Sequence, residues 1–286
     1  MTRDQHSTEA SIISALSSLT QHQLSHLTHT ISAHFHHHLR RLSALLSSPI
    51  LFSQTLRHLH SLSLPQKSLL LSRHLLFCLR HLTAPFTTFL PPPPPLYSLR
   101  LQEYDSVLIL LLLCDLHQND PKALQAPHSH WRTLLSTHML TTMLNISSIW
   151  VSSGAVLLKY VAMVARCFNF ATQAGSDQCI EVAASRAVVV SLTSVEVKPA
   201  KGKGEESCVI CREEMSEGRD VCELPCQHLF HWMCILKWLR KRNTCPCCRF
   251  CLPSDDVYSE IRRLWGVVVE KAGGSVEEYS LSPFTC

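Results

Sequence analysis

The chain has 286 residues, of which 46% are hydrophobic, so it can bury a core and is not disordered as a whole. Its formal net charge of +4, from 26 basic and 22 acidic residues, is too small to indicate nucleic acid or an anionic membrane as the main partner. Nine of the 14 cysteines fall between positions 208 and 251, whereas the first 200 residues hold four. This clustering indicates a metal site rather than a disulfide scaffold.

The first 102 residues are poor in acids and rich in Ser and Thr, as transit peptides are. Asp4 and Glu9 are the two acids, against seven Arg and one Lys. This pattern runs far beyond an ordinary presequence, and Leu and Ile recur at spacings of three and four, which is typical of packed amphipathic helices. We therefore predict an α-helical region over residues 1–90, with a plastid-address segment as the alternative. The N-terminus has no secretory-signal pattern, so we expect a reducing compartment.

The apolar spacing predicts three or four helices between residues 11 and 82, with Pro49 and Pro65 at positions where helices begin or break. The five prolines of residues 91–95 exclude a helix and predict a polyproline II spacer of about 15 Å, at ~3.1 Å per residue. Residues 96–197 predict a second, mainly helical region.

Two apolar stretches of that second region could be mistaken for membrane spans. The run at 107–114 is far shorter than the ~20 residues that a span needs, which predicts a buried core helix. Residues 133–158 include nine Ser or Thr, so we expect no transmembrane span there. The β-branched residues of 187–197 predict an edge strand or an ordered tether.

Residues 198–206, KPAKGKGEE, have Pro, Gly and charge with nothing to bury, and predict a linker between domains. A finger segment, residues 207–252, follows the linker. In the C-terminal part, residues 253–286, Ser254 opens a helix-capping signal, and a helix with one apolar face extends to Lys271. We expect this helix to pack against either the finger or the helical part.

The finger segment carries eight side chains that can bind zinc: Cys208, Cys211, Cys226, His228, His231, Cys234, Cys245 and Cys248. Zinc takes four Cys or His ligands in a tetrahedron, so eight ligands indicate two ions. A segment of this size has too little core to fold alone, and each structural zinc adds on the order of 10 kcal/mol of coupled folding free energy. The sequence therefore predicts two structural Zn²⁺ ions.

The ligand order and spacing resemble those of the RING-H2 finger, with every ligand in register over the finger segment. The resemblance implies a cross-brace, in which Cys208, Cys211, His231 and Cys234 hold one ion and Cys226, His228, Cys245 and Cys248 hold the other. The expected fold is thus a mainly α N-terminal region plus a small zinc-stabilised α+β RING-H2 cross-brace domain at the C-terminus.

The residues between the ligands also match the pattern of RING fingers that act as ubiquitin ligases. Ile210, Trp238 and Pro246 stand where such fingers form a shallow apolar groove for the conjugating enzyme, the E2. Arg249 stands where active members carry a cation that contacts both ubiquitin and the E2. The resemblance therefore implies a RING-type E3 ubiquitin transferase, which positions an E2–ubiquitin thioester for transfer to lysines of an unknown protein substrate, with no covalent ubiquitin intermediate on the ligase.

Three alternatives remain open at this point. A finger of this kind could be a non-catalytic zinc-binding adaptor between proteins, and a nucleic-acid-binding role is a distant third, so we expect no nucleic-acid partner. Cys222, Cys247 and Cys251 fall outside the ligand register, and we interpret them as spare thiols rather than as a thioester-forming nucleophile. Cys247 adjoins Cys248 and leaves the eighth ligand ambiguous, although the two-residue spacing and the following Arg249 favour Cys248.

The finger stretch resembles plant RING-H2 ligases in general, without the N-terminal membrane span that the ATL type carries. Residues 40–76, RRLSALLSSPILFSQTLRHLHSLSLPQKSLLLSRHLL, resemble a plant RING ligase family of amyloplasts and shoot gravitropism. This second resemblance implies peripheral attachment to the amyloplast surface, with the cytoplasm as the alternative location.

Overall fold

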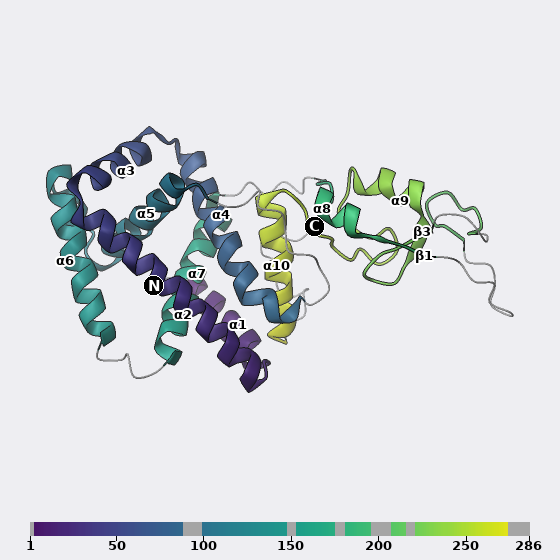
Figure 1. Ribbon diagram of the computed structural model, residues 1–286, viewed down its shortest axis with the longest axis horizontal. Coiled ribbons are helices and arrows are strands. Elements are labelled where there is room, and N and C mark those ends of the chain that lie inside the picture. The colour runs from purple at the N-terminus through teal and green to yellow at the C-terminus, as the bar shows by residue number, and fades with distance from the viewer. Residues whose placement is uncertain are drawn as a thin grey trace.

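The computed structural model describes residues 3–87, 99–147, 153–174, 181–195, 207–215 and 221–273. A helical bundle forms one end of the molecule, a small finger forms the other, and helix α10 lies between them (Figure 1). The predicted fold class is confirmed. The polyproline run at 91–95 and the linker at 198–206 lie outside the described residues.

Four helices open the chain: α1 (Arg3–Ser17), α2 (Gln21–Ser47), α3 (Pro49–Ser61) and α4 (Leu64–Thr83), followed by the 3₁₀ turn η1 (Ala84–Phe86). Thr20 and Gln23 form a capping box at the start of α2, in which Gln23 N donates to Thr20 Oγ1 over 3.3 Å. Pro49 and Pro65 both lie in the first turn of their helices, where a missing N–H costs nothing. The predicted helix starts are therefore confirmed.

The second helical stretch contains α5 (Leu101–Asn119), the 3₁₀ turn η3 (Ala123–Gln125), α6 (His128–Ser147) and α7 (Ser153–Ala174). The apolar run at 107–114 lies in α5, where Val107, Leu108 and Ile109 are fully buried, so it is a core helix as predicted. Within the described residues, Gly154–Thr172 of α7 is long and apolar enough to cross a membrane. In this structure that stretch packs against α4, α2 and α1, as a core helix does.

The helices before and after the proline segment share two apolar cores and form one bundle. One core joins residues of α1, α2, α4, α7 and α10, and the other joins the C-terminal half of α2 to α3, α5 and α6. Arg41 of α2 fixes α5 through two 2.6 Å hydrogen bonds to Asp105, whose side chain is nearly buried. The bundle is therefore a single folding unit built from both predicted helical regions.

The finger contains helix α8 (Arg186–Ser191), strands β1 (Thr193–Val195), β2 (Val221–Glu223) and β3 (Leu229–His231), and helix α9 (Trp232–Leu239). The strands form an antiparallel sheet in the order β1-β2-β3, with Cys222 opposite Ser194 on one side and Phe230 on the other. Phe230, Ile235 and Leu239 are fully buried in its core.

The segment expected as a strand or tether, residues 187–197, is described as far as residue 195 and differs from that expectation, because residues 187–191 are helical. Ser185 caps α8 by accepting a 3.3 Å hydrogen bond from Val188 N, and Val188 is buried in the finger core. The cap outweighs the β-branched composition, which survives as a three-residue edge strand. The finger therefore packs with residues 181–195, upstream of the linker that was expected to separate the two parts.

Candidate metal centre

The structure brings the eight predicted ligands together as two clusters of four. Cys208, Cys211, His231 and Cys234 form one cluster, and Cys226, His228, Cys245 and Cys248 form the other. Within each cluster the ligand atoms all lie within 4.8 Å of one another. The two sets alternate in pairs along the chain, which is the cross-brace that the resemblance implied.

Each cluster draws its ligands from two separate segments of the finger. In the first cluster, the loop at 207–215 supplies two thiols, while His231 ends β3 and Cys234 lies in the first turn of α9. In the second, the β2–β3 turn supplies Cys226 and His228, and the loop after α9 supplies the last Cys pair. Bridging these segments ties the short sheet to α9, although neither element is long enough to be stable alone.

Tight turns at three cysteines aim the thiols into the clusters. In the described residues, the non-glycine positions with positive φ are Arg212 (64°), Gln227 (65°) and Arg249 (58°), and each directly follows a cluster cysteine. Arg212 N donates to Cys208 O over 2.6 Å, and Arg249 N donates to Cys245 O over 2.9 Å. A left-handed residue other than glycine costs about 1–2 kcal/mol. Strained backbone at these three positions is consistent with turns whose geometry is set by metal binding at the preceding cysteine.

The chemistry of the donor set fits zinc. Burial, together with hydrogen bonds that the Cys226 thiol donates to Cys245 and Cys248, raises the pKa of Cys226 to about 12. Burial and the neighbouring thiols of the first cluster likewise raise the pKa of Cys234 to about 11. Thiols this crowded ionise together only beside a cation, and Zn²⁺ deprotonates the thiols that coordinate it.

The two histidines also offer nitrogen atoms to the clusters. His231 Nδ1 lies 3.3 Å from Cys211 Sγ, inside the first cluster. His228 Nδ1 is buried without a hydrogen-bond partner in the described protein, so it is available to a metal. Together with the six thiols, these nitrogens complete two Cys₃His sets, one of the usual structural zinc sites.

The remaining finger cysteines lie outside both clusters. Cys247 is exposed, and its backbone N–H donates to Cys245 Sγ over 3.4 Å while Cys248 supplies the thiol of the cluster. Burial raises the pKa of Cys222 to about 11, and burial also raises the pKa of Cys251. Thiols with raised pKa values are weak nucleophiles at neutral pH, as expected for spare thiols.

The expected partner-binding residues all lie at or near the surface of the finger. Ile210 and Pro246 each occupy a turn between two cluster cysteines, and both are partly exposed. Trp238 of α9 is half-buried, and its Nε1 donates to Thr244 O over 2.7 Å, which fixes the indole against the loop of the last Cys pair. Arg249 is exposed at the end of that loop.

Exposed apolar side chains of the finger were missed by sequence reasoning, and Val209 and Met233 are two of them. Val209 is 57% exposed beside Ile210, and Met233 is 64% exposed on α9. Their spacing carries no signal of its own, because an apolar residue in a small domain is more often core. The folded chain was needed to show that both face solvent.

Comparisons of the finger alone and of most of the chain give the same family. Residues 206–249 match the ring finger domain family. Over 273 residues the chain is 46% identical to "E3 ubiquitin-protein ligase SGR9, amyloplastic" of Arabidopsis thaliana, which covers 91% of this chain and 95% of that protein.

Other relatives match a smaller part of the chain. The chain is 42% identical over 106 residues to E3 ubiquitin-protein ligase RNF181 of Xenopus laevis, covering 37% of this chain and 64% of that protein. It is 36% identical over 114 residues to E3 ubiquitin-protein ligase RDUF1 of Arabidopsis thaliana, covering 40% and 28%. Similarity to SGR9 therefore takes in the bundle as well as the finger.

Proposed function

Because the chain belongs to the family of RING-finger E3 ubiquitin-protein ligases that includes SGR9, we propose a residue-level account of how it works. It is a RING-type ubiquitin transferase with two zinc ions, and ubiquitin passes directly from the E2 to the acceptor. The observation that carries the account is the pair of interleaved Cys₃His clusters. All eight residues of the clusters are used as metal ligands, so none of them serves as a nucleophile.

Zinc serves as a structural brace when it is bound, and the eight cluster residues are its ligands in this proposal. The brace holds α9 and two knuckle turns, residues 208–212 and 245–249, in fixed positions. Ile210, Pro246 and Trp238 then present an apolar surface to the E2. The indole contributes most, because its apolar ring is partly exposed while its N–H is already bonded to Thr244 O.

Arg249 is the polar contact of the same surface. Its guanidinium is a planar fork that can donate to carbonyl groups of ubiquitin and of the E2 at once. Donation to both would hold the thioester-linked ubiquitin in one orientation, with its carbonyl open to an incoming lysine amine. The rate gain is then one of orientation, and no side chain of the finger forms a bond to ubiquitin.

Single-turnover discharge of an E2–ubiquitin thioester onto free lysine tests this account, using full-length protein and a panel of E2 enzymes. We expect Trp238→Ala and Arg249→Ala each to retain two zinc ions and to abolish discharge. Arg212→Ala is the matched control, because Arg212 has the same left-handed backbone at the equivalent position of the other knuckle turn. It should discharge as the parent does.

Two results would overturn the proposal. Loss of zinc from Trp238→Ala would show that the indole belongs to the core rather than to the E2 surface. A parent protein that holds two zinc ions yet discharges no E2 of the panel would favour the non-catalytic adaptor.

We also propose that the protein acts at the amyloplast surface, as its similarity to an amyloplastic relative suggests. Helix α1 of the acid-poor segment is built into the bundle, which supports a surface location over import with cleavage of this helix. Ile12, Ala15 and Leu16 of α1 are buried against α7 and α10, and Thr8 Oγ1 donates to Asn169 Oδ1 over 3.1 Å. Cleavage of a transit segment would remove α1 and open this core.

Protease treatment of isolated intact amyloplasts tests the surface location. We expect untreated amyloplasts to carry the protein at its full mass. We expect added protease to digest it while the envelope is still intact. A shortened protein that resists protease until the envelope is broken would show import instead. The role in shoot gravitropism that the resemblance implies stays a prediction, which reorientation of stems lacking the protein would check.

A further inference from the structure

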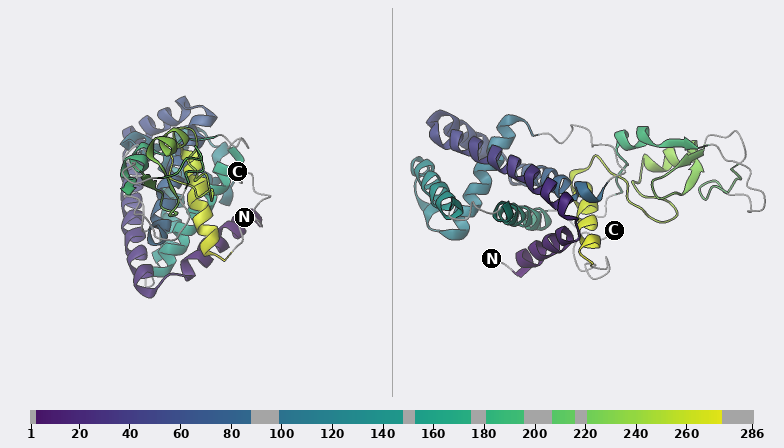
Figure 2. Two further views of the ribbon diagram at one scale, coloured as in Figure 1. Left: turned by 90° about the vertical axis from the view of Figure 1, so that its right-hand side faces the viewer. Right: turned by 60° about the horizontal axis from the view of Figure 1, so that its bottom comes forward.

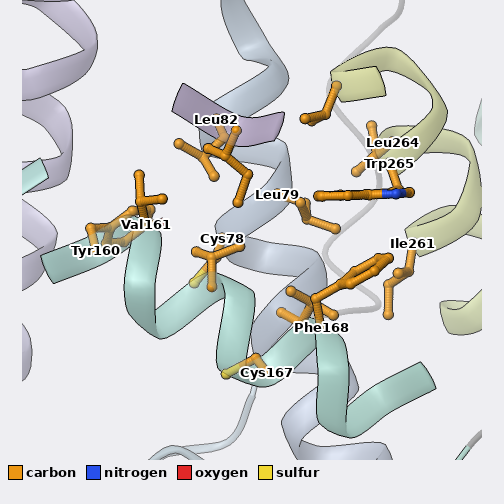
Figure 3. Close-up of a cluster of buried hydrophobic side chains, with 14 of the residues drawn as sticks. Cys78, Leu79, Leu82, Tyr160, Val161, Cys167, Phe168, Ile261, Leu264 and Trp265 are labelled. Carbon is orange, nitrogen blue, oxygen red and sulfur yellow. The ribbon is translucent and has the colours of Figure 1, made fainter. Parts of the chain in front are cut away.

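The finger lies between two chain segments that belong to the same helical core. Helix α7 precedes it, and α10 (Val257–Lys271) follows it and returns to the bundle. Figure 3 shows Ile261, Leu264 and Trp265 of α10 pointing toward Leu79 of α4 and Phe168 of α7. The rings of Trp265 and Phe168 lie 4.1 Å apart, centroid to centroid. The finger is therefore an insertion in the bundle, and the right view of Figure 2 shows α10, in yellow, at the end of the bundle beside the finger.

The connection from the finger to α10 is short, buried and held by hydrogen bonds at both ends. Leu252 N donates to Asn243 O over 2.6 Å, and Pro253 O accepts a 2.8 Å hydrogen bond from Ser185 N. Leu252, Pro253 and Ser254 are all buried, and Asp256 caps α10 by accepting a 2.7 Å hydrogen bond from Ser259 N. Two packed domains with a loose tether would move independently, whereas this connection is fixed to the finger at one end and to α10 at the other.

Glu260 joins the finger, α10 and the bundle through one carboxylate. Its side chain is 2% exposed and accepts two hydrogen bonds from Arg263, of 2.8 and 2.9 Å, on its own helix. Arg80 Nη2 of α4 lies 3.8 Å from Glu260 Oε1, and Ser254 N at the exit of the finger donates to Glu260 Oε2 over 3.3 Å. This buried carboxylate is sensitive to the placement of both neighbours, because moving the bundle breaks its contact with Arg80 and moving the finger exit breaks its hydrogen bond from Ser254 N, while the pair with Arg263 stays within α10.

We propose that Glu260 is a positioning residue that fixes the orientation of the finger on the bundle, and so determines which lysines receive ubiquitin. The proposal rests on the E3 activity proposed above. The E2 held by the finger carries its thioester at a set place, so a lysine fixed to the bundle is reached only if the finger is oriented toward it. Free lysine in solution has no such requirement.

The protein's own lysines provide the test. Lys67, Lys122 and Lys159 lie on the bundle, in α4, before η3 and in α7. Autoubiquitination would be run with full-length protein, at concentrations where the rate per molecule does not depend on protein concentration. Under this condition each molecule modifies its own lysines. Mass spectrometry would then give the share of ubiquitin on each lysine, and discharge of the same E2 onto free lysine would run in parallel.

The variants separate orientation from activity. Glu260→Gln keeps the shape of the side chain and removes its charge, while Glu270→Gln is the matched control on the exposed face of the same helix. We expect Glu260→Gln to discharge onto free lysine as the parent does, and to change the ratio among Lys67, Lys122 and Lys159 by about threefold or more. Glu270→Gln should leave both readouts unchanged. A Gly-Ser-Gly insertion between Ser254 and Asp255 should reproduce the change, and it decides the matter if Glu260→Gln does not fold.

Each outcome bears on one of the two proposals. Lack of discharge by the parent protein would remove the E3 proposal and this one with it. Normal discharge with an unchanged lysine ratio in both the Glu260→Gln and insertion variants would overturn the positioning role alone. A ratio changed by the insertion but not by a folded Glu260→Gln would show that the connection positions the finger without Glu260.

Discussion

Replacing Trp265 with Ala tests whether the helix after the finger is part of the bundle core. The side chain is 9% exposed, so nearly all of the ~200 Å² that a tryptophan can bury is removed from water. Truncation of a buried aromatic side chain to Ala costs about 3–5 kcal/mol, so the free energy of unfolding should fall by about 4 kcal/mol. For a bundle of this size that is a drop in melting temperature of roughly 10 °C.

Far-ultraviolet circular dichroism follows this transition, because the described helices lie mostly in the bundle, and a colorimetric chelator reports zinc release separately. We expect the bundle to lose stability while the finger keeps two zinc ions. Ile13→Ala is the control, since Ile13 is 45% exposed on α1 and should cost less than about 1 kcal/mol. A double-mutant cycle with Phe168→Ala should give a coupling of about 0.5–1.5 kcal/mol for the ring pair. A Trp265→Ala protein that is as stable as the parent would refute the insertion.

Three further changes follow from the same structure. Cys211→Ser should release zinc and unfold the finger while the helical signal of the bundle persists, and zinc content with circular dichroism would check this; two retained zinc ions would contradict the assignment. Asp105→Asn should destabilise the bundle by about 3 kcal/mol, because it leaves the Arg41 guanidinium half-paired in a nearly buried site, and denaturant titration would measure it. Burial lowers the pKa of His38 to about 3 and that of His74 to about 4. Below pH ~6.5 the unfolded chain therefore binds more protons than the folded chain does. The free energy of unfolding should be at its full value above that pH and fall by roughly 1 kcal/mol per pH unit per histidine toward pH 4. His74→Gln should flatten this fall relative to the parent, whereas an equal slope in both would contradict it.

The metal centre was readable from the sequence because ligand chemistry is local. A Cys-x2-Cys pair closes its own turn, so spacing alone predicted eight ligands and two ions. The ambiguity between Cys247 and Cys248 needed the structure, in which the Cys247 backbone bonds to Cys245 Sγ and the Cys248 thiol joins the cluster. The helices were equally readable, since Pro49 and Pro65 mark starts by their own backbone geometry.

What could not be predicted depends on contacts between distant segments. The apolar face of α10 fits the finger and the bundle equally well as a pattern, and only the packing of Trp265 on Phe168 distinguishes them. Val188 has strand-like composition, yet the Ser185 cap and a place in the finger core make its segment helical. Glu260 carries no sequence signal, because its partners Arg80 and Ser254 lie far away along the chain or outside its helix.

The return of α10 to the bundle also determines the order in which the protein is completed during synthesis. The ribosome releases α1 to α7 first, then the finger, and α10 emerges only after the last zinc ligand. Until then Leu79 and Phe168 lack the partner that covers them, while the finger can already bind zinc and close. A message truncated after the finger would therefore yield a folded ubiquitin-transfer module on an unfinished bundle with an open apolar face.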